Sequence, residues 1–236
     1  MNAYLYRIFR DTEEENREVI LGMLEPDPTA RLLDLGCYDG VLTRRLAGAV
    51  GTTDVTGVEV AEEAAARALA SGIKVVRANL NEALPLPSAS FDVIHANQVI
   101  EHLYDTDMFV AEIRRLLAPR GYAVLSTNNL ASLHNIASLG LGRQPPPCHV
   151  SNKLVVGNPF NPFEGQAHES AAMAHLRLFS YYGLRDFLGM QGLNPEIYRT
   201  VGFYPFPPAF ARGLCRVVPV YGAYLTCRVR ANGPNP

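Results

Sequence analysis

The sequence has no excess of charge of either sign, and it has few cysteines. Its 236 residues include 21 Lys and Arg against 23 Asp and Glu, a formal net charge of −2. A dedicated nucleic-acid-binding protein usually has a basic footprint, and the overall charge gives no sign of one. The four cysteines are Cys37, Cys148, Cys215 and Cys227, and no two of them have Cys-x-x-Cys spacing. The sequence therefore predicts neither a zinc site nor a disulfide framework.

Long hydrophobic runs are also lacking. No stretch of about 18 apolar residues occurs, so we expect no membrane-spanning helix. The first residues, MNAYLYRIFRDTEEENRE, contain no apolar core followed by a cleavage site, so we expect no secretory signal. Together with reduced cysteines, these absences predict a cytoplasmic protein without an integral membrane segment. Hydrophobic residues still make up 48% of the chain, which is enough for the core of one α/β domain.

Strand and helix patterns alternate through the first 127 residues. Short apolar runs predict strands at residues 32–35, 55–59, 73–76, 91–94 and 122–126. Helical periodicity lies between them, at residues 41–50, 61–71 and 109–117. An earlier helix is expected to begin at Asp11 and to end at Pro26. This alternation predicts right-handed crossovers and an open parallel sheet with helices on both faces.

The pattern changes after about residue 128. Residues 141–168 are rich in Pro, Gly and Asn, and a loop of that length in a compact domain is usually functional or disordered. A helix is expected at 180–191, with closing strands at 195–203 and 220–229. The seven strands predict one Rossmann-like, doubly wound, mostly parallel α/β domain. Its expected parts are an N-terminal cap (1–29), a cofactor-binding core (30–130), an acceptor lid insertion (131–178) and a C-terminal helix with closing strands (179–236).

The most informative motif follows the first strand, where residues 32–40 are LLDLGCYDG. Gly36 lets the backbone pass close to a ligand, and Asp39 is suited to cap the next helix. Nineteen residues after Gly40, Glu59 ends the second strand, where a carboxylate can accept both hydroxyls of a ribose. Ligands of open α/β sheets bind beyond the carboxyl ends of the strands. The motif therefore predicts an adenosine-containing ligand.

A dinucleotide is a poorer match, because two glycines of the G-x-G-x-x-G fingerprint are missing. Counting from Gly36, Tyr38 and Val41 stand at the second and third glycine positions. A nicotinamide-dependent oxidoreductase is therefore an alternative hypothesis and not the leading one. A tight turn in a ligand-free α/β protein is a further alternative, against which Glu59 counts.

Four segments resemble the class I S-adenosylmethionine-dependent methyltransferases. LLDLGCYDG is similar to their first motif, and VTGVEV (55–60) to the segment whose acid holds the ribose. LPLPSASFDVIHANQVIEHL (84–103) and RRLLAPRGYAVLSTNN (114–129) resemble the stretch from the adenine loop through the fifth strand. The nearest branch contains the quinone-biosynthesis O-methyltransferases and other small-molecule enzymes. The resemblance implies S-adenosylmethionine as cofactor and O-methylation of a small, largely apolar or aromatic acceptor.

The resemblance also implies roles by position. Asp34, Gly36 and Gly40 would frame the methionine end of the cofactor, and Cys37 and Tyr38 belong to the same turn. The remaining cofactor-binding candidates are Glu59 for the ribose, Val60 for the adenine, Asn79 and Leu80 for the adenine edge, and Asn97 and Gln98 under the methionine moiety. Two positions depart from the family pattern. Tyr38 replaces the usual middle glycine, and Asn79 stands where an aspartate is common, so its amide oxygen would accept without charge assistance.

His102 is the first candidate for the base that removes a proton from an acceptor hydroxyl. The alternative, in which His102 only packs or caps a turn, has equal weight. His134, His149, His168 and His175 lie in or near the insertion and could also reach an acceptor, whereas His95, inside a strand, is expected to be a satisfied core residue. Glu101 could pair with a metal ion, but no ligand cluster is visible in the sequence, so no metal site is predicted.

The insertion and the segment 201–210 supply apolar and aromatic side chains for an acceptor pocket: Phe160, Phe163, Met173, Phe203, Tyr204, Phe206 and Phe210. Such a lining suits a largely apolar small molecule. The alternative is a surface loop whose aromatic residues fill a small core of their own. A non-catalytic protein that binds S-adenosylmethionine is the remaining functional alternative. No feature of the sequence indicates an oligomeric state.

Overall fold

A computed structural model describes residues 3–168 and 174–232 and contains one open, seven-stranded sheet. The strand order is β3-β2-β1-β4-β5-β7-β6. The strands are β1 (Leu32–Leu35), β2 (Val55–Glu59), β3 (Lys74–Arg77), β4 (Phe91–Asn97), β5 (Leu117–Asn128), β6 (Leu193–Val201) and β7 (Tyr224–Ala231). The first five strands are parallel, and β7 is antiparallel to both of its neighbours. The mostly parallel, doubly wound sheet is the predicted fold.

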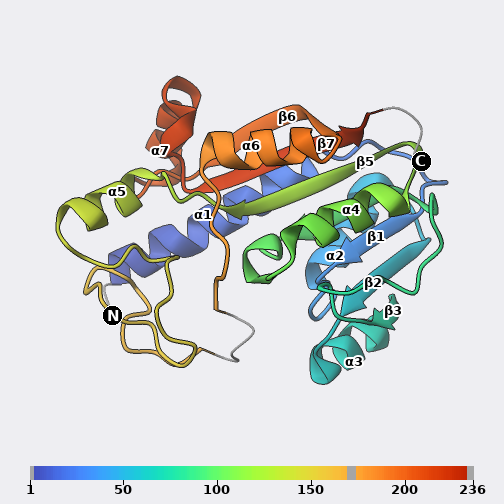
Figure 1. Cartoon of the computed structure of the whole chain (residues 1–236), viewed down its shortest axis with the longest axis horizontal. Coiled ribbons are helices and arrows are strands. Elements are labelled where there is room, and N and C mark those ends of the chain that lie inside the picture. Colours follow the sequence, from blue (N-terminus) through green and yellow to red (C-terminus); the bar gives the residue numbers. More distant parts are fainter. Residues whose placement is uncertain (1–2, 169–173, 233–236) are drawn as a thin grey trace.

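Helices cover both faces of the sheet (Figure 1). On one face lie α1 (Ala3–Leu21), α2 (Val41–Val50) and α3 (Glu62–Ala70), and on the other α4 (Thr106–Leu116) and α6 (Tyr181–Met190). Successive strand residues point to opposite faces, so Leu32 packs in the core under α1 and α2 while Leu33 packs in the core under α4. This two-sided burial explains why the strands are continuous apolar runs.

Two further helices, α5 (Leu133–Gly140) and α7 (Pro208–Val217), lie at one end of the molecule (Figure 1). Two 3-10 turns complete the described elements: η1 (Ile100–His102) between β4 and α4, and η3 (Pro219–Tyr221) between α7 and β7. The residues of the 141–168 segment form no helix and only one isolated bridge, between Leu154 and Ala167. No helix among the described residues is long and apolar enough to cross a membrane.

The first helix begins earlier than predicted. It starts at Ala3, and Asp11 lies inside it rather than at its N-terminus. The reason is that α1 buries Thr12 and Asn16 together with Ile8 and Ile20, so half of its buried stripe is polar. An apolar periodicity search does not detect such a stripe. Similarly, α5 was not predicted, and Leu117, expected in the preceding helix, is the first residue of β5.

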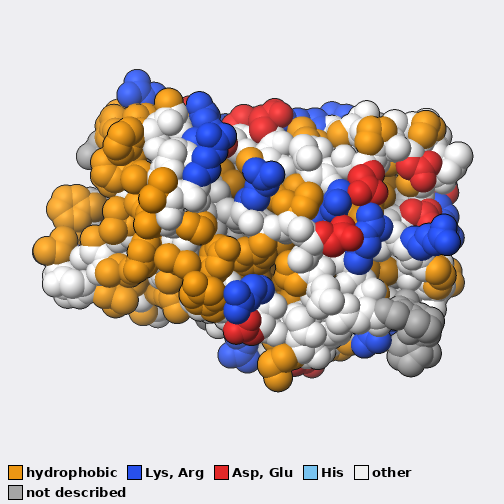
Figure 2. Space-filling model, turned by 90° about the horizontal axis from the view of Figure 1, so that it is seen from above, with side chains coloured by type: hydrophobic (Ala, Val, Ile, Leu, Met, Phe, Trp, Pro, Cys, Tyr) orange, Lys and Arg blue, Asp and Glu red, His pale blue; other side chains and the backbone are white. Residues whose placement is uncertain are grey.

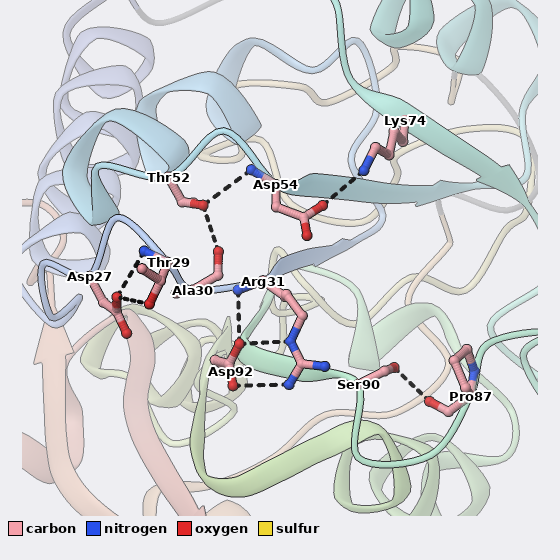
Figure 3. A network of polar contacts seen from close by, with 10 residues as sticks. All are labelled: Asp27, Thr29, Ala30, Arg31, Thr52, Asp54, Lys74, Pro87, Ser90 and Asp92. Carbon is pink, nitrogen blue, oxygen red and sulfur yellow. Dashed lines mark hydrogen bonds and ion pairs between the residues drawn. The ribbon is translucent and has the colours of Figure 1, made fainter.

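A polar network fixes the amino ends of the strands (Figure 3). The Asp92 carboxylate accepts hydrogen bonds from the Arg31 backbone N–H at 2.9 Å and from the Arg31 guanidinium at 2.9 and 3.1 Å. These bonds to Arg31 lower the pKa of Asp92. Since Arg31 precedes β1 and Asp92 lies in β4, the network sets the register between these two strands. The same register aligns their carboxyl ends, where the candidate site lies.

Candidate cofactor and acceptor site

The carboxyl ends of β2, β1 and β4 are neighbours in the sheet. The chain moves outward from β1 to β2 and β3, then returns to the other side of β1 with β4. Such a reversal leaves a crevice between the loops that follow the central strands, and ligands of open α/β sheets bind there. The predicted cofactor residues come from these loops.

The turn after β1 requires glycine at Gly36. Its φ is +78°, and a Cβ there would lie 2.7 Å from Val99 Cγ2. The N–H groups of Gly36 and Cys37 both donate to the carbonyl oxygen of Val58, at 2.9 and 3.1 Å. The turn is thereby tied to β2.

The Glu59 carboxylate faces the same turn. Its Oε2 accepts from the Tyr38 N–H at 3.0 Å and its Oε1 from the Ala61 N–H at 2.8 Å. A carboxylate has about four acceptor sites, so two backbone bonds orient Glu59 and leave capacity for ligand hydroxyls. The prediction that Gly36 and Glu59 lie together is therefore met.

Gly36 and Glu59 line one cavity of about 140 Å³. The other lining residues are Val58, Val60, Ala78, Asn79, Leu80, Asn81, His102 and Leu103. Apolar side chains thus form most of the wall, with a carboxylate at one side and an imidazole at another. An adenosine, with an apolar ring face and a diol, matches this distribution of groups.

Tyr38 and Gly40 both have left-handed backbones in this turn. The φ of Tyr38 is +48°, a conformation that favours the glycine expected at this position. Its ring is half exposed and lies 5.4 Å from the guanidinium carbon of Arg67. Gly40, not Asp39, is the N-cap residue of α2, but Asp39 Oδ1 accepts from the Val41 N–H at 3.0 Å and so satisfies the first residue of the helix.

The side chains of Asp34 and Cys37 point away from the cavity. The buried Asp34 carboxylate accepts from Thr43 Oγ1 at 2.5 Å and from His95 Nδ1 at 2.7 Å. Cys37 packs against Gly57, where an added Cβ would lie 2.5 Å from its sulfur, and burial raises the pKa of its thiol to about 12. Both side chains support the turn from behind. His95 is a buried core residue, as expected, but only its Nδ1 has a hydrogen-bond partner, because Nε2 is buried without one.

Asn79 and its neighbours form a compact loop at the adenine side of the cavity. Asn79 Oδ1 accepts from the Asn81 N–H at 3.0 Å, and its Nδ2 donates to Glu82 at 3.0 Å. Asn81 Oδ1 in turn accepts from the Tyr104 N–H at 3.0 Å, which ties the loop to the segment after η1. Leu80 lines the cavity, and Val60 lines it while remaining 58% exposed.

Asn97 and Gln98 end β4 on the side toward α1 and β5, and neither lines the cavity. Asn97 Oδ1 accepts from Asn16 Nδ2 at 3.2 Å, and Gln98 Oε1 accepts from Asn128 Nδ2 at 2.9 Å. Asn16 was not predicted as part of this region. It also donates to Ser126 Oγ at 2.9 Å, so a buried asparagine of α1 links the ends of β4 and β5. The sequence signal that could have found Asn16 is a polar residue at a position that helical periodicity places on the buried face of α1.

His102 ends η1 and lines the cavity. Its Nδ1 lies 3.3 Å from the carbonyl oxygen of Ala174, which can only accept, so Nδ1 carries the proton and Nε2 is the basic nitrogen. The neighbouring Glu101 is fully buried and accepts from Thr127 Oγ1 at 2.9 Å and Asn128 Nδ2 at 3.1 Å. Burial raises the pKa of Glu101 to about 7.

Four of the six histidines form one cluster beside this site. The ring of His175 lies 4.9 Å from that of His102 and 4.4 Å from that of His149, and the His168 ring lies 4.6 Å from that of His149. Burial is the main cause that lowers the pKa of His149 to about 4 and of His175 to about 3. Both are therefore neutral at physiological pH. Histidines of the segment that was predicted to form a lid therefore lie beside His102 and the cavity.

Glu101, His102 and His175 could hold a divalent cation, because one ligand atom from each lies within 4.8 Å of the others. Two imidazoles and a carboxylate are a donor set that suits Zn²⁺ or Fe²⁺. No pattern in the sequence indicated this cluster, and the expectation that the protein binds no metal stays a prediction. His175 is brought to His102 by the return of the chain from the lid, and no local spacing motif records that approach.

The aromatic residues predicted to line an acceptor pocket divide into packed and exposed side chains. Phe163 lies edge-on to Phe9 at 4.9 Å and to Tyr6 at 6.0 Å, and the ring of Tyr204 lies 4.9 Å from that of His134. Phe203 is buried, whereas Phe160 and Phe210 are exposed. Met173 lies outside the described residues. None of the described aromatic candidates lines the cavity, and the Phe163 and Tyr204 contacts favour the alternative of a small core of their own.

Known proteins are similar to this chain in sequence and in fold. A family model described as a methyltransferase domain matches residues 6–194. A Mycobacterium tuberculosis protein named "Probable S-adenosylmethionine-dependent methyltransferase" is 32% identical over 231 residues, 89% of this chain and 77% of that protein. A ubiquinone biosynthesis O-methyltransferase of a Chelativorans species is 33% identical over 121 residues, 50% of this chain and 46% of that enzyme.

Solved structures show the same architecture. The 1,6-didemethyltoxoflavin-N1-methyltransferase of Burkholderia thailandensis, solved with S-adenosylhomocysteine, has a TM-score of 0.58 over 94% of this chain and 79% of that chain, at 18% identity. The chain therefore belongs to the class I S-adenosylmethionine-dependent methyltransferases, and S-adenosylmethionine is its cofactor. Neither the oxidoreductase nor the non-catalytic alternative is supported.

Proposed function

We propose that this methyltransferase acts on a hydroxyl of a small, largely apolar or aromatic acceptor. The observation that carries the proposal is the single cavity that joins Gly36 and Glu59 to His102. The relatives named ubiquinone biosynthesis O-methyltransferase, which match about half of this chain, support the choice of a hydroxyl. When bound, S-adenosylmethionine supplies a methyl group on a positively charged sulfur.

The proposed roles in cofactor binding follow from where each residue lies. Glu59 binds the ribose, Val60 and Leu80 contact the adenine faces, and Asn79 contacts the adenine edge. The backbone of Gly36, Tyr38 and Gly40 holds the methionine end. Four further residues support this turn or the adjacent strand end: Asp34, Cys37, Asn97 and Gln98.

His102 is proposed as the base. A proton on Nδ1, fixed by the Ala174 carbonyl oxygen, leaves Nε2 to accept a proton from the acceptor hydroxyl. The neutral His149 and His175 surround it without adding positive charge that would oppose the protonation of His102. General-base assistance of this kind contributes roughly 10²–10⁴-fold.

Titration calorimetry with S-adenosylmethionine tests the cofactor site. Glu59→Ala should bind roughly 10–150-fold more weakly, the effect of about 1.5–3 kcal/mol for hydrogen bonds to a charged group. Glu62→Ala is the matched control, because Glu62 is an exposed acid three residues away that pairs with Arg77. Equal affinity of Glu59→Ala and the wild type would refute the ribose role.

Formation of S-adenosylhomocysteine with a panel of phenols, catechols and primary amines tests the reaction. Transfer to hydroxyls should exceed transfer to amines, and His102→Gln should lower kcat roughly 10²–10⁴-fold. His149→Gln, from the same histidine cluster, should lower it less than about tenfold. Activity that is lost on chelation with EDTA and restored by Zn²⁺ would instead assign Glu101, His102 and His175 to a metal ion and contradict the base.

A further inference from the structure

The helix α5 is amphipathic in the reverse of the usual sense, because its polar residues face the protein. Asn135 is fully buried and its Nδ2 donates to the Asn129 carbonyl oxygen at 3.0 Å. Ser138 Oγ accepts from Asn158 Nδ2 at 3.0 Å. These bonds fix the orientation of α5 and turn its large apolar residues outward: Leu133 is 36% exposed, Ile136 46% and Leu139 61%.

Exposed apolar side chains continue from α5 onto its neighbours. Asn129 Nδ2 donates to the carbonyl oxygens of Val220 and Gly222, so the start of α5 adjoins η3 and the end of α7, while Asn158 joins its other end to the lid loop. The exposed residues of these neighbours are Val150, Leu154, Phe160, Phe210, Val217 and Tyr221.

Figure 2 shows a broad area of apolar side chains at the end of the molecule where Figure 1 has α5 and α7. Isolated exposed leucines are ordinary on protein surfaces, but a contiguous area marks an interaction site. We call this area the apolar end face. It comprises the exposed apolar residues of α5, α7, η3 and the 141–168 loop.

The carboxy-terminal half of the chain, which supplies the apolar end face, has an excess of basic residues. Residues 113–236 contain twelve Lys and Arg but only four Asp and Glu, whereas residues 1–112 contain nine and nineteen. No acidic residue occurs between Glu112 and Glu164 or after Glu196. The elements of the face contribute four exposed basic residues, Arg143, Lys153, Arg212 and Arg216, against one exposed acidic residue, Glu164. Arg212 pairs with Glu15 of α1 at 3.3 Å, so three of the four basic residues are left to approach a ligand. The nearly neutral net charge of the whole chain is therefore the sum of an acidic amino-terminal half and a basic carboxy-terminal half.

We propose that the apolar end face binds the surface of an anionic phospholipid bilayer. Leucine and isoleucine side chains of α5 enter the boundary between headgroups and acyl chains, and the basic residues at the rim approach lipid phosphates. A second copy of this chain could also cover the apolar area. It would, however, bring two basic rims together, which disfavours that pairing.

Co-sedimentation of the full chain with vesicles tests the proposal. The protein should pellet with vesicles of phosphatidylglycerol and phosphatidylcholine in equal parts and remain in the supernatant with phosphatidylcholine alone. Raising the salt concentration should weaken binding, since the attraction between the basic rim and the lipid is screened. Absence of binding to the anionic vesicles would overturn the proposal.

Surface variants locate the binding face. Ile136→Ser combined with Leu139→Ser should lower the partition coefficient at least tenfold, and Arg216→Ser about fivefold, the equivalent of about 1 kcal/mol for one basic residue near an anionic surface. Leu69→Ser is the matched control, because Leu69 is equally exposed on the distant α3 (Figure 1) and should have no effect.

Two outcomes would contradict the assignment of the face. One is unchanged vesicle binding by the Ile136→Ser, Leu139→Ser variant with thermal unfolding like that of the wild type. The other is a wild-type dimer, detected by light scattering, that becomes monomeric in this variant, since a second copy would then occupy the face.

Discussion

At the scale of the residue, Glu101 combines complete burial with uncharged hydrogen-bond partners. Thr127 and Asn128 donate to its carboxylate, and His102 and His175 lie within reach. Its pKa in the folded protein, about 7, is above its ordinary value of 4.5, and the cause is burial. Between these two pH values the unfolded chain loses the proton and the folded chain keeps it. The free energy of unfolding therefore falls as the pH rises through this window.

Glu101→Gln should remove this pH dependence. Relative to the wild type, the variant should be more stable at pH 8 than at pH 5 by on the order of 2 kcal/mol, whatever constant cost the lost carboxylate bonds add. His149 and His175, whose lowered pKa values oppose folding at acidic pH, contribute equally to both proteins and cancel in the difference. Thermal unfolding at several pH values measures it, and a difference that does not change with pH would contradict the ionisation argument.

At the scale of the element, α5 reverses the usual rule for which substitutions destabilise a helix. Asn135→Leu makes the helix more apolar but removes a buried hydrogen bond to Asn129, and we expect it to cost about 1–3 kcal/mol. Ile136→Ser removes an apolar residue that is exposed, and we expect a change of less than about 0.5 kcal/mol. Urea unfolding measures both. If Ile136→Ser were the more damaging, the orientation of α5 would be wrong.

The elements that were predicted correctly are those whose signals are local. The bounds of β1, α2 and β2 follow from apolar runs and glycines, and parallel strands bring Gly36 and Glu59 to one edge without further information. The start of α1 was missed because half of its buried stripe is polar, and α5 was missed because its buried residues are polar. The Nδ2 groups of Asn16 and Asn135 donate to Ser126 and to the Asn129 carbonyl oxygen, and the sequence pattern does not record such pairings.

The candidate site also contains residues that local sequence signals predict and residues that they do not. His102 lies shortly after β4, a strand that is predicted by its own apolar run. His149, His168 and His175 are far from His102 in the sequence and cluster with it only in the fold. Their segment has no periodicity from which this approach could be predicted. The histidine cluster, and with it the cation-binding geometry, therefore needed the structure.

At the scale of the whole molecule, β7 is the strand on which the closing part of the sheet depends. It pairs with β5 along one edge and with β6 along the other, and its Leu225, Cys227 and Val229 belong to the core beneath α4 and α6. Deleting residues 224–236 should therefore abolish cooperative thermal unfolding and leave β5 as an open edge prone to aggregation. A sharp transition measured by circular dichroism in the deletion variant would contradict this.

The position of β7 also bears on how the chain is made. Ribosomes synthesise β6 before β7, yet among the strands that the structure describes only β7 pairs with β6. While translation proceeds, the segment from Leu193 to Val201 must stay unpaired until the strand that joins it to the rest has left the ribosome. Nascent chains that pause in this interval would present a bare β-strand, and chaperones that hold extended segments would find their substrate there.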